Sequence, residues 1–433
     1  MYQTTYIHPK ALRIGLFVRL DMDWTSHPFS FNNFLLRDVD QVRQLQALGL
    51  ERVLCDVKRS EPQALKTASV ASAAPAAPAA ASSAQAAGVP TAAPAELVDA
   101  LKSKAQRLAR LKTQMAQLDA AEKSFHAAVR EMSLVTKNLF AQPIESLRRA
   151  REVVDALLRS MVNVEDVQLH LMNSRPNSRD VHDHELNTAS LAMLLGRRLG
   201  LTEDALRDLG MACLMHDIGK REMPDSLTRK IGVLSTVERD ALQQHVPKSM
   251  LVGREMVLDR PVLDAIAQHH EMADGSGYPR QLKLEGISRG GQILALANAF
   301  DNLCNPHHAM MGLTPHEALK MLFARERRRF APDALAGFIK MMGIYPPGTL
   351  VELSDGSQGL VLSVGAQDAL RPVILLRELG ASRSEPVIVN LLEEKALSIR
   401  RGMQRSELSI EAATYLNPRR HVSYYASDVT GAG

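Results

Sequence analysis

Five histidines and one aspartate have the residue types and the spacing of a metal centre. The chain contains 14 histidines, and five of them fall on successive segments with helical periodicity: His184, His216, His245, His269 and His270. Asp217 follows His216 directly, and both side chains can reach one ion only where a helix ends, as Gly219 suggests. Imidazole and carboxylate together suit iron, manganese, zinc or nickel. Six groups exceed the needs of one ion, so the pattern predicts a two-metal site bridged by Asp217.

Two neighbouring metal ions are suited to the hydrolysis of phosphate esters. Such a pair generates the nucleophile, neutralises the phosphoryl oxygens and stabilises the leaving group. A single histidine in a helix is usually only a hydrogen-bonded core or surface residue, so the prediction depends on the joint pattern. The sequence has no Ser-His-Asp order typical of a serine hydrolase and no GxxxxGK[ST] phosphate-binding loop.

Composition excludes several other classes of protein. The net charge is only +4, which argues against binding to DNA or to a membrane surface. Three widely spaced cysteines without a CxxC pair argue against a disulfide scaffold or a thiolate zinc site. No apolar run reaches the length of about 20 residues that a membrane span requires. We therefore expect a cytoplasmic protein without a membrane span.

The residues that would hold the metals lie in one part of a multidomain, mainly α chain. Hydrophobic periodicity predicts helices at Leu186–Leu199, Glu203–His216 and Val262–Glu271. From about residue 145 to residue 343 the sequence shows only helical periodicity. Changes in pattern predict a small α+β domain (1–62), an Ala/Pro/Ser linker (63–95), an amphipathic helix (96–145), a helical domain (146–343), a small β module (344–408) and a tail of mixed pattern (409–433). Within the tail, residues 419–421 and 431–433 are expected to be poorly ordered.

Apolar residues from Leu97 to Met132 recur at steps of three and four, which predicts a long helix with a heptad seam. Lys104 and Glu122 interrupt the seam. Two interpretations stay open: a parallel coiled coil that joins two copies of the chain, or a single amphipathic helix packed on its own domain.

The metal-binding pattern resembles the HD-GYP family. The resemblance covers about residues 160–343 and rests on His216-Asp217-Ile218-Gly219-Lys220 and on a complete HHExxDGxGYP motif from His269 to Pro279. The family is a helical branch of the HD metal-dependent phosphohydrolases. The resemblance implies hydrolysis of cyclic di-GMP to linear pGpG or onward to GMP, at a di-iron or di-manganese centre. Residues 18–21, Trp24 and 27–29 also resemble a domain often placed before HD-GYP modules.

The resemblance also implies roles for individual residues. Asp217, Lys220 and Lys230 would be catalytic, because the family keeps lysines near the metal-bound phosphate and their charge would stabilise a developing oxyanion. Asp180 stands four residues before His184, where some members place a further acidic ligand. The loop beside the site would contribute to substrate binding together with both lysines, through Gly275, Gly277, Tyr278 and Pro279. The same loop could dock a partner protein.

Two departures from the family pattern concern activity. Asn298 stands where the last metal-binding aspartate is usual, and an amide oxygen brings no charge. Residues 305–310 lack the arginines that commonly meet substrate phosphate, and His307 and His308 are expected at the surface. The favoured interpretation is a cyclic di-GMP phosphodiesterase. The alternative is a binding module that holds cyclic di-GMP or a signalling partner without efficient turnover.

Overall fold

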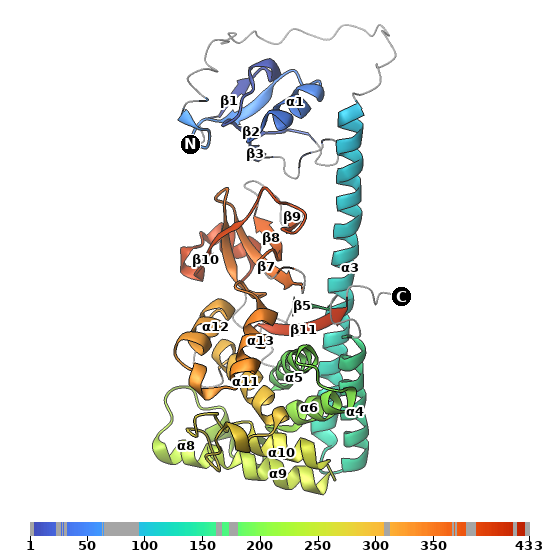
Figure 1. Cartoon of the computed structure of the whole chain (residues 1–433), viewed down its shortest axis with the longest axis vertical. Helices are drawn as coiled ribbons and strands as arrows, with labels where there is room; N and C mark the ends of the chain where they lie inside the picture. Colours follow the sequence, from blue (N-terminus) through green and yellow to red (C-terminus); the bar gives the residue numbers. More distant parts are fainter. Residues whose placement is uncertain are drawn as a thin grey trace. The chain divides into compact units, whose positions relative to one another are not determined.

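The computed structural model describes residues 4–22, 27, 29, 33–62, 64, 95–161, 167–172, 181–306, 312–365, 368, 370–377, 387–418 and 422–428. These residues form two compact units that divide near residue 114 (Figure 1). Nearly all of the predicted linker lies outside the described residues, as do Asp180, His307 and His308.

The N-terminal unit is a small α+β fold, as the alternating sequence predicts. Its antiparallel sheet has the order β1-β4-β2-β3, formed by Thr4–Ile7, Val53–Asp56, Phe17–Arg19 and Asn33–Leu35. Helix α1 (Val39–Ala47) begins after Asp38, whose carboxylate accepts a hydrogen bond from the Gln41 amide at 2.7 Å. Leu45 of this helix is fully buried among the apolar residues of the sheet.

The second unit is built on a helical domain. Its main helices are α4 (Pro143–Arg159), α5 (Val181–Arg198), α6 (Glu203–Met215), α8 (Thr236–Gln243), α9 (His245–Glu255), α10 (Arg260–Gln268), α11 (Arg289–Cys304), α12 (Pro315–Ala324) and α13 (Pro332–Met342). Helices α5, α6 and α11 form its centre, and no described side chain of α5 or α11 is exposed. Because these helices are apolar around most of their circumference, the few polar groups that they carry inward stand out.

Helix α3 (Ala95–Asn138) contains the predicted heptad seam. Phe125, Val129 and Met132 of the seam are buried in the core of the helical domain, whereas Met115 is 40% exposed. The C-terminal half of the seam therefore packs on its own domain, as the second interpretation predicted. The side chains of Leu97, Leu101, Leu108 and Leu111 lie outside the described set.

A seven-stranded antiparallel sheet corrects two expectations. Its strands are β5 (Val167–Met172), β6 (Leu350–Leu353), β7 (Gln358–Val364), β8 (Val373–Arg377), β9 (Val387–Asn390), β10 (Ile399–Met403) and β11 (Ser423–Asp428). Strand β5 interrupts a region predicted to be wholly helical, and β5 and β11 extend the sheet beyond the bounds predicted for the β module (344–408). Helix α14 (Ile410–Leu416) and β11 lie in the tail of mixed pattern.

The pairing of β5 with β11 explains both errors (Figure 1). Each strand has only six residues, and its partner lies about 250 residues away in the sequence, so no local pattern reveals the pair. In β11, consecutive Tyr424, Tyr425 and Ala426 are all buried, because the strand is covered on both faces. A strand of that kind lacks the alternation by which exposed strands are detected.

Candidate metal centre

The centre forms where helix α6 ends. His216 is the last residue with helical geometry, and Asp217 already departs from it, with φ −102° and ψ 7°. This change of direction lets both adjacent side chains face the same point. Gly219 then allows α9 to approach, because a Cβ at that position would lie 2.5 Å from the Ser249 amide nitrogen. The amide of Gly219 also donates to the Ser249 hydroxyl at 2.9 Å.

The Asp217 carboxylate lies between two groups of histidines. Its Oδ2 lies 3.7 Å from His184 Nε2 and 3.5 Å from His216 Nε2. Its Oδ1 lies 3.3 Å from His245 Nε2 and 3.8 Å from His269 Nε2. The two groups, His184 with His216 and Asp217, and Asp217 with His245, His269 and His270, each place their ligand atoms within 4.8 Å of one another.

Three of these rings are oriented by the backbone. The Nδ1 atoms of His216, His245 and His269 lie 2.8, 2.6 and 2.6 Å from the carbonyl oxygens three residues earlier, at Cys213, Leu242 and Ile266. A carbonyl can only accept, so each Nδ1 carries the proton and each Nε2 presents a lone pair to the centre. The three carbonyls lie in the last turns of α6, α8 and α10, where carbonyl oxygens have no donor four residues later in the helix.

The centre fits metal ions. His184 Nε2 faces His216 Nε2 at 3.3 Å, and His245 Nε2 faces His269 Nε2 at 3.2 Å. Lone pairs at such distances repel unless a cation lies between them. Asp217 Oδ1 is buried and accepts no hydrogen bond within the described part of the chain. This His/Asp cluster can therefore hold divalent metal ions.

The protonation states also favour metal binding. Burial lowers the pKa of His216 to about 4, and burial together with neighbouring histidines lowers the pKa values of His269 and His270 well below the usual range. Burial opposes ionisation of Asp217, but Lys220 and the histidines outweigh it and hold the pKa of this carboxyl well below its ordinary value. Neutral imidazoles and an ionised carboxylate are the forms that bind metals.

His184 is oriented differently, by a carboxylate. Its Nδ1 lies 2.6 Å from Oδ2 of Asp301, which is fully buried on α11. Burial lowers the pKa of His184, but the hydrogen bond and charge of Asp301 outweigh it, so that the pKa is raised. The sequence motifs assign no role to Asp301, which lies three residues after Asn298 on the same helix. The sequence signal for its role is its spacing from Asn298, because residues i and i+3 lie on the same face of a helix.

The HHExxDGxGYP loop packs against the second group. The ring of Tyr278 stacks on His270 with centroids 4.6 Å apart, and the Tyr278 amide donates to the His270 carbonyl at 3.0 Å. Buried Glu271 accepts hydrogen bonds from the amides of Arg280 and Leu282 at 2.6 and 2.8 Å. At Gly277 a Cβ would lie 2.5 Å from the Glu271 Cα. The glycine is thus required for this close return of the loop to the histidines.

The remaining predicted residues are not equally close to the centre. Lys220 Nζ lies 2.5 Å from Asp217 Oδ2. Lys230 Nζ instead lies 2.6 and 2.7 Å from the two carboxylate oxygens of Glu238 on α8. Asn298 is buried on α11, where its Oδ1 accepts a hydrogen bond from Asn302 at 2.6 Å.

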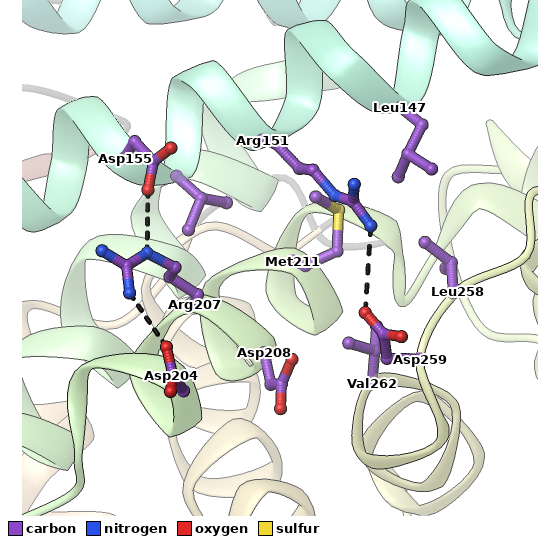
Figure 2. A pocket seen from close by; sticks show the side chains of 11 residues that line it. Leu147, Arg151, Asp155, Asp204, Arg207, Asp208, Met211, Leu258, Asp259 and Val262 are labelled. Carbon is purple, nitrogen blue, oxygen red and sulfur yellow. Dashed lines mark hydrogen bonds and ion pairs between the residues drawn. The ribbon is translucent and has the colours of Figure 1, made fainter.

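A separate cavity of about 310 Å³ opens between α4, α6 and the start of α10 (Figure 2). Arg207 pairs there with Asp155 at 3.1 Å and with Asp204 at 3.0 Å. Asp208 lines the same cavity, and burial together with Asp259 raises its pKa. None of the histidines of the centre lines this cavity.

The helical fold holds a His/Asp cluster that shares Asp217 and can bind divalent metal ions. A family model described as an HD domain matches residues 156–334, and one described as a domain of unknown function, DUF3391, matches residues 5–150. Residues 156–334 are therefore an HD domain, and the complete His269–Pro279 motif makes it one of the HD-GYP type.

The chain is similar to several curated bacterial proteins. It is 28% identical over 372 residues to a cyclic di-GMP phosphodiesterase of Pseudomonas aeruginosa, covering 83% of this chain and 82% of that protein. It is 29% identical to a cyclic di-GMP phosphodiesterase response regulator of Xanthomonas campestris, over 49% of this chain and 58% of the relative. It is also 29% identical to a 3′3′-cGAMP-specific phosphodiesterase of Vibrio cholerae, over 41% of this chain and 39% of the relative.

No helix in the described residues is long and apolar enough to cross a membrane.

Proposed function

We propose that this chain is a metal-dependent phosphodiesterase that hydrolyses cyclic di-GMP to pGpG, GMP or both. The observation that carries the proposal is the pair of histidine groups that share the Asp217 carboxylate. The names of the relatives support the substrate class. A dianionic cyclic dinucleotide needs positive charge at its binding site, and two bound cations would supply it. The net charge of the sequence does not include bound ions, so it does not reveal this charge.

The metal ligands in this proposal come from both histidine groups, with divalent iron or manganese as the ions. The ligands are His184, His216, Asp217, His245, His269 and His270, with Asn298 and Asp180 as further candidates. When bound, the two ions supply a nucleophile at neutral pH and neutralise the phosphoryl oxygens. Asp217 would hold both ions at a fixed separation, since each of its oxygens faces one group.

The chain's own residues would bind and orient the substrate. Lys220 lies beside Asp217 with its side chain 27% exposed, so its ammonium can reach a phosphoryl oxygen from the edge of the centre. Tyr278, held on His270, and the adjoining Gly275, Gly277 and Pro279 would form one wall of the substrate site. Lys230 would take part only if its ammonium leaves Glu238, so we assign it the smaller share of phosphate binding.

Asn298 favours a second candidate function, a module that binds cyclic di-GMP without efficient turnover. A neutral amide in place of a carboxylate lowers metal affinity, and Asn298 is already hydrogen-bonded to Asn302. Calorimetry separates the two candidates. The enzyme converts bound cyclic di-GMP to product when loaded with Fe²⁺ or Mn²⁺, whereas the binding module holds it unchanged.

Two interactions complete the proposal. A homodimer would form through the helix at 97–132, and the packing of Phe125 and Met132 inside their own domain limits the available seam to its N-terminal half. A partner protein would dock on the exposed edge of the loop, at Asp274, Ser276 and Arg280. The cytoplasmic location remains a prediction from the cysteine spacing.

A test of the function uses metal-stripped chain reloaded with Mn²⁺ or Fe²⁺ and incubated separately with cyclic di-GMP and 3′3′-cGAMP. We expect the reloaded protein to hydrolyse cyclic di-GMP faster. Faster hydrolysis of 3′3′-cGAMP would instead indicate the substrate for which the Vibrio cholerae relative is named. Binding of metal without any turnover would favour the binding module.

A further inference from the structure

The C-terminal strand is hydrogen-bonded to the metal centre through two buried asparagines. Asp301, which orients His184, has a second oxygen, Oδ1. This oxygen accepts hydrogen bonds from the side-chain amides of Asn187 at 3.0 Å and Asn305 at 2.9 Å. Asn187 is on α5, one turn after His184, and Asn305 follows the last residue of α11. Asp301 therefore receives hydrogen bonds at both oxygens.

The same two asparagines hold the backbone at the start of β11. Each side-chain amide nitrogen has two hydrogens, and its second contact is the Val422 carbonyl, at 3.0 Å from Asn187 and 2.8 Å from Asn305. Their carbonyl oxygens accept in turn from the amides of Tyr424 and Val422, both at 2.9 Å. All of the hydrogen-bonding groups of these two side chains that face the strand are thus used.

Burial makes this network rigid. Asp301 and Tyr424 are fully buried, and Asn187 is 1% exposed, so water does not compete for the hydrogen bonds of Asn187, whereas Asn305 is half-buried. Hydrogen bonds to a charged carboxylate are stronger than neutral ones, and a low local dielectric constant strengthens them further. A shift of the Val422 backbone would therefore move both asparagines, and with them the carboxylate that holds His184.

We propose that β11 is a working part of the metal centre, and that Asn187 and Asn305 are positioning residues that couple its backbone to His184 through Asp301. The inference rests on the proposed metal-dependent function. The strand lies far beyond residue 334, where the match to the HD domain ends. A change in the seven-stranded sheet would reach the centre by this route.

The two histidine groups should depend on β11 unequally. His184 belongs to only one group, the one with His216 and Asp217. In the other group, His245 and His269 are oriented by backbone carbonyls three residues earlier, at Leu242 on α8 and Ile266 on α10. Loss of the asparagine network should weaken one metal site and leave the second unchanged.

The test is calorimetric titration of the metal-stripped full chain with Mn²⁺, for the wild type and for Asn305→Ala and Asn305→Asp. Asn305→Asp retains the acceptor for the Val422 amide but loses both donated hydrogen bonds. We expect two sites in the wild type, and in both variants about 10- to 100-fold weaker binding at one site only. The matched control is Ser160→Ala, which removes the hydrogen bond to the Ala426 carbonyl of the same strand at 2.9 Å without touching Asp301. Both sites should keep their affinity in the control.

Unchanged affinity at both sites in the Asn305 variants would overturn the inference, as would equal weakening of both sites or an effect of Ser160→Ala of the same size. Thermal melting without metal identifies a variant that has lost its fold. If the Asn305 variants do not fold, titration of Asn187→Ala with Mn²⁺ tests the same network through the asparagine on α5. The proposed function fails separately: a wild type that binds two ions but does not hydrolyse cyclic di-GMP overturns the activity alone. A wild type that binds no metal overturns both.

Discussion

Replacement of Asp217 by asparagine should greatly weaken metal binding at both halves of the centre. The substitution keeps the size of the side chain and removes its charge. Asp217 is the one residue shared by the two histidine groups found in the described chain, and its two oxygens face different groups. Other ligands belong to a single group, so their loss should affect mainly one ion.

The size of the effect follows from electrostatics. Two unit charges 4 Å apart interact by about 4 kcal/mol at an effective dielectric constant near 20. A bound divalent ion carries twice that charge, and a ligand oxygen lies only about 2 Å away. About 4 kcal/mol is therefore a low value for the loss at each ion, and it corresponds to about a thousand-fold weaker binding.

The assay is titration of metal-stripped Asp217→Asn with Mn²⁺, followed by calorimetry and by metal analysis after gel filtration. Asp208→Asn is the matched control, because Asp208 is an aspartate within helix α6 that lines the separate cavity of Figure 2 and not the metal centre. We expect the control to bind like the wild type. Binding by Asp217→Asn within tenfold of the wild type at both sites would refute the reasoning.

Three further predictions concern other parts of the second unit. Asn298→Asp should raise metal occupancy and the rate of cyclic di-GMP hydrolysis, and an unchanged rate would mean that this position is not a ligand. Gly277→Ala should lower the free energy of unfolding by about 1–3 kcal/mol in urea titrations, because its Cβ would lie 2.5 Å from the Glu271 Cα; Gly286→Ala, where the nearest atom is 3.5 Å away, should cost little. Burial in β5 lowers the pKa of His170 from 6.5 to about 4, so between these values the unfolded chain binds a proton that the folded chain does not, and stability falls as the pH decreases. His170→Leu should remove about 2 kcal/mol of the stability difference between pH 7 and pH 5, and an equal difference in both proteins would contradict this.

The clustering of the candidate ligands can be predicted from the sequence because these residues fall on local motifs. His216 and Asp217 are adjacent, and His269 and His270 begin a motif of eleven residues. The rings of His216 and His269 are oriented by carbonyls three residues earlier, so this part of the geometry is produced within single helices. The structure brings together His184, His216, Asp217, His245, His269 and His270.

What the sequence does not predict depends on contacts between distant residues. Asp301 reaches His184 across 117 positions, and β11 pairs with β5 across a still longer separation. The heptad seam indicates that one face of α3 is covered, but not that Phe125 and Met132 are covered by their own domain. Lys220 and Lys230 are equivalent by resemblance, and only the structure shows that Glu238 binds Lys230.

Metal analysis and a cyclic di-GMP hydrolysis assay on the same preparation test the central claim most directly. The proposed function predicts two Fe or Mn ions per chain, and conversion of cyclic di-GMP to pGpG or GMP at a rate that rises with metal content. Two bound ions with tight binding of cyclic di-GMP and no product would contradict it.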